Sequence, residues 1–156
     1  MLHVPFTAVG ISHHLVALDE LAELSRVADP VTAAIDADPQ LLGRVVLNTC
    51  NRFEVYFESE SFHSALEAVL GTIRAALPAA SRNVVAEFEI YPGQAAVQHL
   101  LEVTAGLDAM VIGEAEIIGQ VREALAAADG RAGATLTRLF HAALTTAKAV
   151  STHTDL

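Results

Sequence analysis

The single cysteine of this 156-residue chain lies in a polar segment that directly follows an apolar, β-branched run. Residues 44–50 predict a buried strand, and Leu47-Asn48-Thr49-Cys50-Asn51-Arg52 would bring the thiol out at its end. The thiolate is the nucleophilic form of cysteine, and a guanidinium two positions away favours that form. Reactive groups are common where a rigid strand gives way to a loop. Cys50 is therefore a candidate nucleophile, although these residues leave burial as a small core hydrophobe equally open.

His99 is the second residue whose type and position suggest chemistry. It shares one face of a predicted helix with Ala96, Leu100 and Val103, so its imidazole is expected to point inward. A partly buried imidazole facing a strand-end cysteine can act as a general acid or base. A core histidine bonded to a backbone carbonyl explains the same pattern, and the spacing alone does not bring His99 to Cys50.

A third cluster of polar residues surrounds the start of a predicted helix. Glu114 and Glu116 fall in its first turn, where carboxylates complement the helix dipole, and Gln120 lies on its polar side. No metal site is expected, because the chain has one cysteine and the pair His13-His14 has no third ligand nearby.

Composition and charge limit the class of protein. The chain is 53% hydrophobic and 18% charged, which predicts one folded globular domain. A net charge of −10 argues against a general nucleic-acid binder, because phosphates require Lys and Arg. A lone cysteine excludes an intrachain disulfide and suits a reducing cytoplasm. We expect neither a signal peptide nor a membrane span, since no apolar run has the required length or flanks.

The elements that must position these residues fall into two parts. Residues 1–92 predict an α+β fold, and residues 93–156 predict a helical segment built from three apolar-faced helices. In the first part, the order β-α-α-β-β-α-β has the form of a ferredoxin-like split βαβ antiparallel sheet with helices. The predicted strands are 4–12, 44–50, 53–58 and 86–91, and the predicted helices are 18–26, one capped by Asp29 with Pro30 at its first position, and 60–77.

Three segments together resemble the glutamyl-tRNA reductase family. They are residues 10–14 (Gly-Ile-Ser-His-His), residues 47–52 followed by Glu54, and residues 106–114 continuing through Gly119-Gln120-Val121. Their order and spacing also fit, with His99 seven residues before Gly106. The resemblance covers 1–156 and implies the N-terminal catalytic domain of a V-shaped, three-domain protein. The NADPH-binding and dimerisation domains are expected to be absent, because no G-x-G-x-x-G turn follows a strand.

The resemblance implies reduction of glutamyl-tRNA to glutamate-1-semialdehyde with NADPH, the first committed step toward 5-aminolevulinate and tetrapyrroles. Cys50 would form a glutamyl thioester, His99 would assist proton transfer from the same cavity, and Arg52 would pair with the substrate carboxylate. Implied partners are glutamyl-tRNA, a second copy bound through the missing C-terminal domain, and the downstream aminomutase. The residues implied to contact substrate are Thr49, Asn51, Arg52, Glu54, Ala109, Glu114, Glu116 and Gln120.

Two positions depart from the family pattern, and two other functions remain open. Many relatives have Ser at the position of Ala109 and Gln at the position of Glu116, so Ala109 removes a hydroxyl that would contact substrate. One alternative is a cysteine-dependent acyl-transfer or hydrolase domain without a redox role. The other is a non-catalytic ferredoxin-like interaction module in which Cys50 is buried. Without a cofactor domain, the chain alone is expected to form the thioester and hydrolyse it rather than reduce it.

Overall fold

The structure is a computed structural model that describes residues 6–107 and 116–154, with side chains described as far as residue 150. Its elements mix strands and helices up to Pro92 and are helical beyond it. In chain order they are β1 (Phe6–Ser12), α1 (Leu18–Arg26), α2 (Ala28–Asp36), β2 (Leu41–Asn48), β3 (Arg52–Ser59), α3 (Phe62–Ala76), the 3₁₀ helix η1 (Ala79–Glu87), β4 (Glu89–Pro92), α4 (Gln94–Thr104), α5 (Glu116–Ala128) and α6 (Gly133–Thr154).

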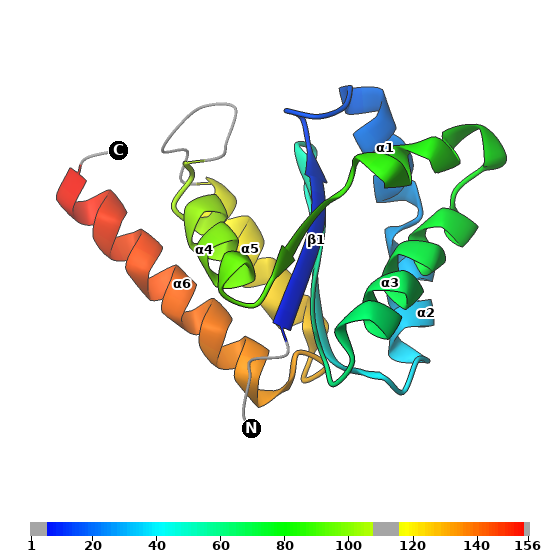
Figure 1. The fold of residues 1–156 in the computed structure, drawn as a ribbon. Helices are drawn as coiled ribbons and strands as arrows, with labels where there is room; N and C mark the ends of the chain where they lie inside the picture. The colour runs from blue at the N-terminus through cyan, green and yellow to red at the C-terminus, as the bar shows by residue number, and fades with distance from the viewer. Residues whose placement is uncertain (1–5, 108–115, 155–156) are drawn as a thin grey trace.

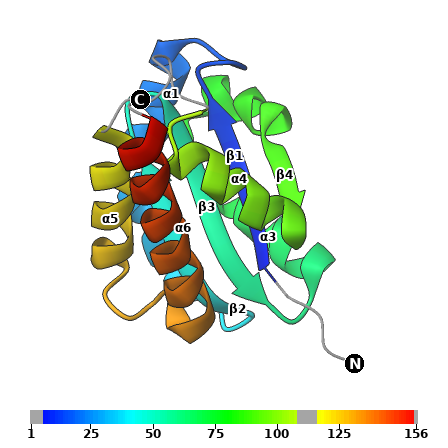
Figure 2. The ribbon, with the colours of Figure 1, turned by 90° about the vertical axis from the view of Figure 1, so that its left-hand side faces the viewer.

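The four strands form one antiparallel sheet in the order β2-β3-β1-β4. β3 pairs antiparallel with both β1 and β2, so β1 and β2 run in the same direction with β3 inserted between them. This is the split βαβ arrangement, and it confirms the ferredoxin-like α+β fold predicted from the element order. Figure 2 shows the sheet behind α4, α5 and α6.

Helices cover both faces of the sheet and make three layers. In Figure 1, α1, α2 and α3 lie on one side of β1, and α4, α5 and α6 lie on the other. Because successive strand side chains point to opposite faces, each strand supplies two cores. The first core includes Val9, Ile11, Phe53, Val55 and Phe57, and the second includes Phe6, Ala8, Val45, Leu47 and Tyr56.

Most predicted elements are present, with differences at their ends. α1 has the predicted bounds, and α3 ends before Pro78 as expected. α2 begins at Ala28, so Asp29 stands in the first turn rather than at the cap, where its carboxylate still complements the dipole. β4 is shorter than predicted, because η1 continues to Glu87 and buries Val84 and Val85. Within the described residues no helix is long and apolar enough to cross a bilayer.

The loop between α5 and α6 is fixed against the outer edge of β2. The Arg44 backbone N–H donates to the Arg131 carbonyl at 2.9 Å, next to a register irregularity at Gly43. A Cβ at Gly43 would lie 2.3 Å from the Ala132 carbonyl oxygen, so only glycine allows this approach. The Arg44 side chain holds Asp36 of α2 through contacts of 2.7 and 2.9 Å. One edge strand thus connects the helices of both faces.

Replacing Gly43 with alanine should destabilise the fold by about 1–3 kcal/mol, because the added methyl meets backbone that has no room to move. Urea unfolding of the 156-residue chain measures the change. Gly71→Ala in α3 is the matched control: its Cβ would contact nothing within 4 Å, and removing a helical glycine should stabilise by about 1 kcal/mol. Equal effects of the two substitutions would show that the loop is not held closely against β2.

Candidate functional site

Cys50 lies in the tight turn that joins β2 to β3. The Thr49 backbone N–H donates to the Arg52 carbonyl at 2.9 Å, and the Thr49 hydroxyl accepts from the Asn51 N–H at 3.1 Å. The turn therefore uses its polar atoms internally and leaves the thiol exposed. This confirms the expected accessibility of Cys50 and removes the premise of a buried cysteine on which the interaction-module interpretation depended.

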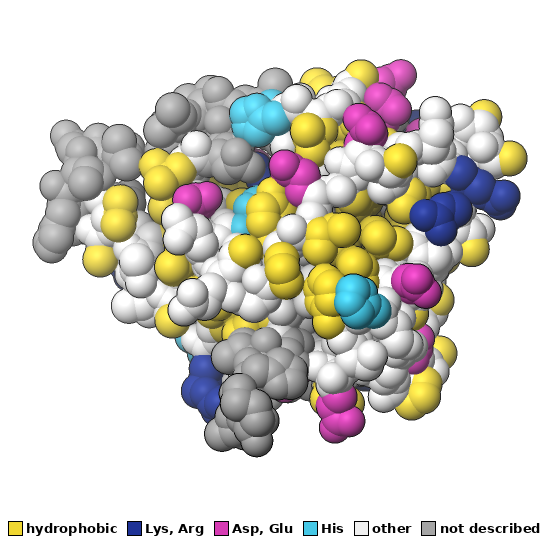
Figure 3. All heavy atoms as spheres, viewed as in Figure 1, with side chains coloured by type: hydrophobic (Ala, Val, Ile, Leu, Met, Phe, Trp, Pro, Cys, Tyr) yellow, Lys and Arg dark blue, Asp and Glu magenta, His cyan; other side chains and the backbone are white. Residues whose placement is uncertain are grey.

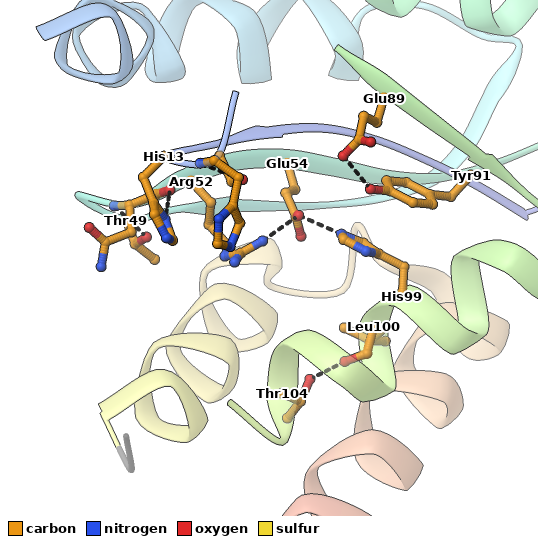
Figure 4. A network of polar contacts seen from close by, with 12 residues as sticks. His13, Thr49, Arg52, Glu54, Glu89, Tyr91, His99, Leu100 and Thr104 are labelled. Atoms are coloured by element: carbon orange, nitrogen blue, oxygen red, sulfur yellow. Dashed lines mark hydrogen bonds and ion pairs between the residues drawn. The ribbon is translucent and has the colours of Figure 1, made fainter. Parts of the chain in front are cut away.

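The first segment of the resemblance meets this turn. The backbone N–H of His13 donates to the Asn51 carbonyl at 2.9 Å, and its ring Nδ1 lies 3.4 Å from the same oxygen. His13, which the sequence presented only as half of a histidine pair without a third metal ligand, thus packs on the cysteine turn, as Figure 4 shows. The end of β1 and the turn after β2 are joined in this way.

A small hollow of about 40 Å³ opens beside the thiol. Its strand side is polar, and its helix side combines apolar residues of α4 and α5 with polar ones of α5. The lining residues are Thr49, Cys50, Asn51, Arg52, Val103, Glu116, Ile117 and Gln120. Most of the residues that the resemblance implies for substrate contact therefore meet here. Glu54 is not among them, and Ala109 and Glu114 lie outside the described residues.

Glu54 is buried next to this hollow and holds three side chains. It is 2% exposed, and strand alternation places it with Arg52 and Tyr56 on the β3 face beneath α4. Its Oε2 accepts from Arg52 Nη1 at 2.9 Å and contacts His99 Nε2 at 2.6 Å, while Oε1 accepts from the Tyr56 hydroxyl at 2.8 Å. Figure 4 shows Arg52 and His99 converging on this carboxylate from opposite sides.

The space for this carboxylate comes from Gly10 on the neighbouring strand. Gly10 pairs with Glu54 across β1 and β3. A Cβ at Gly10 would lie 2.8 Å from Glu54 Cγ, closer than real side chains allow. The glycine of the first resemblance segment is thus explained by the volume of a buried acid on the next strand.

Electrostatics keep Glu54 charged and Tyr56 neutral. Burial raises the pKa of Glu54. The hydrogen bond and charge of His99 and the charge of Arg52 together lower this pKa by more than burial raises it, so it lies below the usual value. Burial, together with the adjacent Glu54 charge, raises the pKa of Tyr56 well above its ordinary value. Tyr56 is therefore a hydrogen-bond donor to a carboxylate throughout the physiological range.

His99 lines a second, smaller hollow. The residue is 7% exposed, and its ring stacks on Tyr91 with centroids 3.9 Å apart and planes 10° apart. This hollow has a volume of about 10 Å³, and its lining residues are Gly10, Ile11, Ser12, Arg52, Glu54, Glu89, Tyr91 and His99. Cys50 and His99 thus line two neighbouring hollows with Arg52 in the wall of both, not the single cavity that the resemblance led us to expect.

Known proteins that resemble this chain are glutamyl-tRNA reductases. The family model described as "Glutamyl-tRNAGlu reductase, N-terminal domain" matches residues 9–154. The chain belongs to this family. It is 42% identical over 149 residues to the glutamyl-tRNA reductase of Micrococcus luteus, covering 93% of this chain and 33% of that protein. It is 39% identical to the glutamyl-tRNA reductase of Pseudarthrobacter chlorophenolicus, covering 93% and 34%.

A solved glutamyl-tRNA reductase from Methanopyrus kandleri has the same fold. The TM-score is 0.73 at 27% identity, and the match covers 96% of this chain and 35% of that one. The chain therefore spans about a third of the length of the glutamyl-tRNA reductases it matches.

Sequence reasoning found the cysteine turn but missed part of the buried network. Tyr56 could have been found from strand alternation, which places it on the same face of the strand as Arg52 and Glu54. No local signal pointed to Tyr91, which stacks on His99 where α4 packs against β4.

Glu54→Gln should lower stability most at neutral pH. Because the fold lowers the pKa of Glu54, its charged form adds stability above the pKa of the unfolded chain, and that contribution is lost as pH falls through the folded pKa. The difference in unfolding free energy between the native chain and Glu54→Gln should therefore shrink on acidification from about pH 7 to about pH 3. Urea unfolding at several pH values measures it, with the exposed Glu60→Gln as control. A constant difference would show that Glu54 is not held as a carboxylate.

Proposed function

We propose that this chain is the part of a glutamyl-tRNA reductase that takes glutamate from its tRNA as a thioester. The observation that supports this most directly is the exposed Cys50, presented by a tight turn beside a hollow with Arg52 in its wall. Membership of the family gives the substrate class, because the matched relatives are named glutamyl-tRNA reductase. The whole enzyme would convert glutamyl-tRNA to glutamate-1-semialdehyde, for tetrapyrrole biosynthesis in the cytoplasm.

The step assigned to this chain is an acyl transfer. The Cys50 thiolate attacks the ester carbonyl that joins glutamate to the terminal ribose of the tRNA. A C–S bond forms, the ester C–O bond breaks, and the ribose oxygen leaves with a proton. Dividing a difficult reaction into two easier steps is the usual gain of covalent catalysis. We assign the accompanying proton transfer to His99, a buried imidazole whose hollow shares Arg52 with the hollow of Cys50.

The dimensions of the Cys50 hollow favour an amino-acid side chain as its occupant. A volume of about 40 Å³ is a few times the roughly 10–15 Å³ that one water needs. It admits the end of a glutamyl group and leaves the tRNA outside. Arg52 would bind the substrate carboxylate, since its guanidinium lies in the wall of the hollow beside Cys50 and its planar fork of N–H donors matches a carboxylate. Thr49 and Asn51 would shape the turn, and Glu116 and Gln120 would close the far side.

Recognition of the tRNA would depend on more than this chain's surface. The net charge is −10, and on the described face that Figure 3 shows, basic side chains are few and separated. Phosphate contacts require clustered Lys and Arg. We therefore propose that this chain recognises the glutamyl end, and that the longer protein supplies most of the tRNA contacts. Ala109 and Glu114, in residues 108–115, remain predicted substrate contacts.

The Cys50 site does not fit the NADPH that the family uses. The hollow beside Cys50 is far smaller than a dinucleotide, and no strand of the chain is followed by a G-x-G-x-x-G turn. No three metal-binding side chains converge among the described residues either. We propose that reduction uses a cofactor domain of the longer protein. The longer protein would dimerise through a separate C-terminal domain and pass its product to the aminomutase.

Incubation with glutamyl-tRNA labelled in the glutamate should transfer label to the 156-residue chain through a hydroxylamine-sensitive thioester. Cys50→Ser should abolish this labelling with the fold intact, because it nearly conserves volume. Free glutamate should then appear slowly by hydrolysis, and NADPH should make no difference. Acid-quenched gel analysis and chromatography of the released product measure both.

Each failure of this experiment has a distinct meaning. Labelling that persists in Cys50→Ser would exclude Cys50 as the nucleophile, and no labelling of the native chain would favour a non-catalytic module. Semialdehyde formed by this chain with NADPH would place the cofactor site within it. Testing the longer protein for NADPH oxidation separates a reductase from a cysteine-dependent hydrolase.

A further inference from the structure

Two contacts of different kinds fix the orientation of the His99 imidazole. On its edge, Nε2 lies 2.6 Å from Glu54 Oε2, and since a carboxylate only accepts, Nε2 carries the proton. On its face, the ring stacks on Tyr91 with an interplanar angle of 10°. The stack fixes the plane of the imidazole, and the hydrogen bond fixes its rotation within that plane. Together they determine where Nδ1 points.

Tyr91 is itself held in place. It lies on β4, where it pairs with Ala8 of β1, and its hydroxyl donates to Glu89 Oε1 at 2.7 Å. Figure 4 shows the phenol ring between Glu89 and His99. Its backbone is thus fixed by the sheet and its ring tip by a carboxylate. A ring fixed at both ends can act as a rigid surface for a neighbour.

The stack of Tyr91 on His99 differs in geometry from the other close aromatic pairs of the cores. The other close aromatic pairs of the cores, Phe53–Phe88 and Tyr56–Phe140, meet edge to face at 74° and 86°. Edge-to-face contacts are a preferred arrangement for aromatic rings. Stacking is the other preferred arrangement, and in the stack of Tyr91 on His99 the Nε2 edge of the imidazole lies 2.6 Å from Glu54 Oε2. The contact therefore orients the His99 ring in addition to burying its apolar face.

The alignment extends to the hollow that contains the thiol. Glu54 Oε2 is shared by His99 Nε2 and Arg52 Nη1, and Arg52 lines the hollow beside Cys50. A tilt of the imidazole would weaken its bond to Oε2 and leave the carboxylate partly unpaired in a buried site. The chain of contacts from Tyr91 to His99, Glu54 and Arg52 thus joins an edge strand to the cysteine site.

We propose that Tyr91 is a positioning residue for His99, holding the imidazole in the plane in which Nε2 meets Glu54. Its effect on the reaction rests on the proposed function, whereas its effect on the ring does not. The two effects can therefore be measured separately.

The first test is NMR of the ¹⁵N-labelled 156-residue chain. The His99 Nε2–H resonance should be observable in the native chain, because bonding to Glu54 protects it from exchange with water. It should persist in Tyr91→Phe, which keeps the ring, and be lost in Tyr91→Val, which keeps strand propensity without the ring. Ile90→Ala, the exposed neighbour on β4, should leave it unchanged.

An unchanged Nε2–H resonance in Tyr91→Val would overturn the proposal. Tyr91→Leu carries the same expectation and covers the case in which the valine variant does not fold. Unfolding of both, with Tyr91→Phe folded, would make Tyr91 a purely structural residue and would also overturn it.

The second test is the rate of Cys50 acylation by glutamyl-tRNA across pH. Tyr91→Val should slow acylation at least about tenfold and change the pH profile, because small misplacements of a catalytic group are costly, whereas Tyr91→Phe should restore both. Native acylation and pH profile in Tyr91→Val would contradict the catalytic part of the proposal. Absence of acylation in the native chain would refute the proposed function and leave the NMR result to decide the positioning role.

Discussion

The site depends on one buried negative charge. Glu54 loses nearly all its hydration inside the fold, a cost that Arg52, His99 and Tyr56 offset by contacting both of its oxygens. Removing any one of these partners would leave a charge in a poorly solvated place, which is usually more damaging than the absence of the whole group. These residues therefore act as a unit. The space they require explains Gly10, and the shared oxygen explains how His99 and Arg52, from different elements, are held together.

This unit also explains why the helical residues after Pro92 form part of the site. The sheet contributes Glu54, Arg52 and the cysteine turn, whereas His99 comes from α4 and half of the Cys50 hollow comes from α4 and α5. The sheet alone would leave Glu54 exposed to water and the thiol without a hollow beside it. The contacts of Gly43 and Arg44 with the α5–α6 loop hold this helical layer against the β2 edge of the sheet.

Local sequence patterns predicted the features that depend on neighbouring residues, such as the turn after a strand and the buried face of a helix. The apolar run before Cys50 located the turn, and the inward face of α4 followed from helical spacing. The burial of Glu54 was less accessible, because β3 is buried on both faces and its alternation of side chains does not separate core from solvent. Tyr91 and His99 are close in sequence, but their stack depends on how α4 packs against β4, which the spacing of residues does not encode. Strand ends were predicted least well: β2 begins three residues before the predicted strand and β4 begins three residues after it, whereas α2 begins one residue before its expected cap.

The covered edge of β2 has a consequence for how this domain behaves in a crowded solution. Open sheet edges offer unpaired N–H and C=O groups to which a strand of another molecule can add, and such addition begins many aggregates. At β2, the Arg131 carbonyl already accepts the Arg44 N–H, and the backbone at Ala132 lies too close to Gly43 for a foreign strand to enter. At the opposite edge, β4 is only four residues long and ends in Pro92, which has no N–H to donate. Both edges of the sheet are therefore poor templates for strand addition, although the sheet itself is largely apolar.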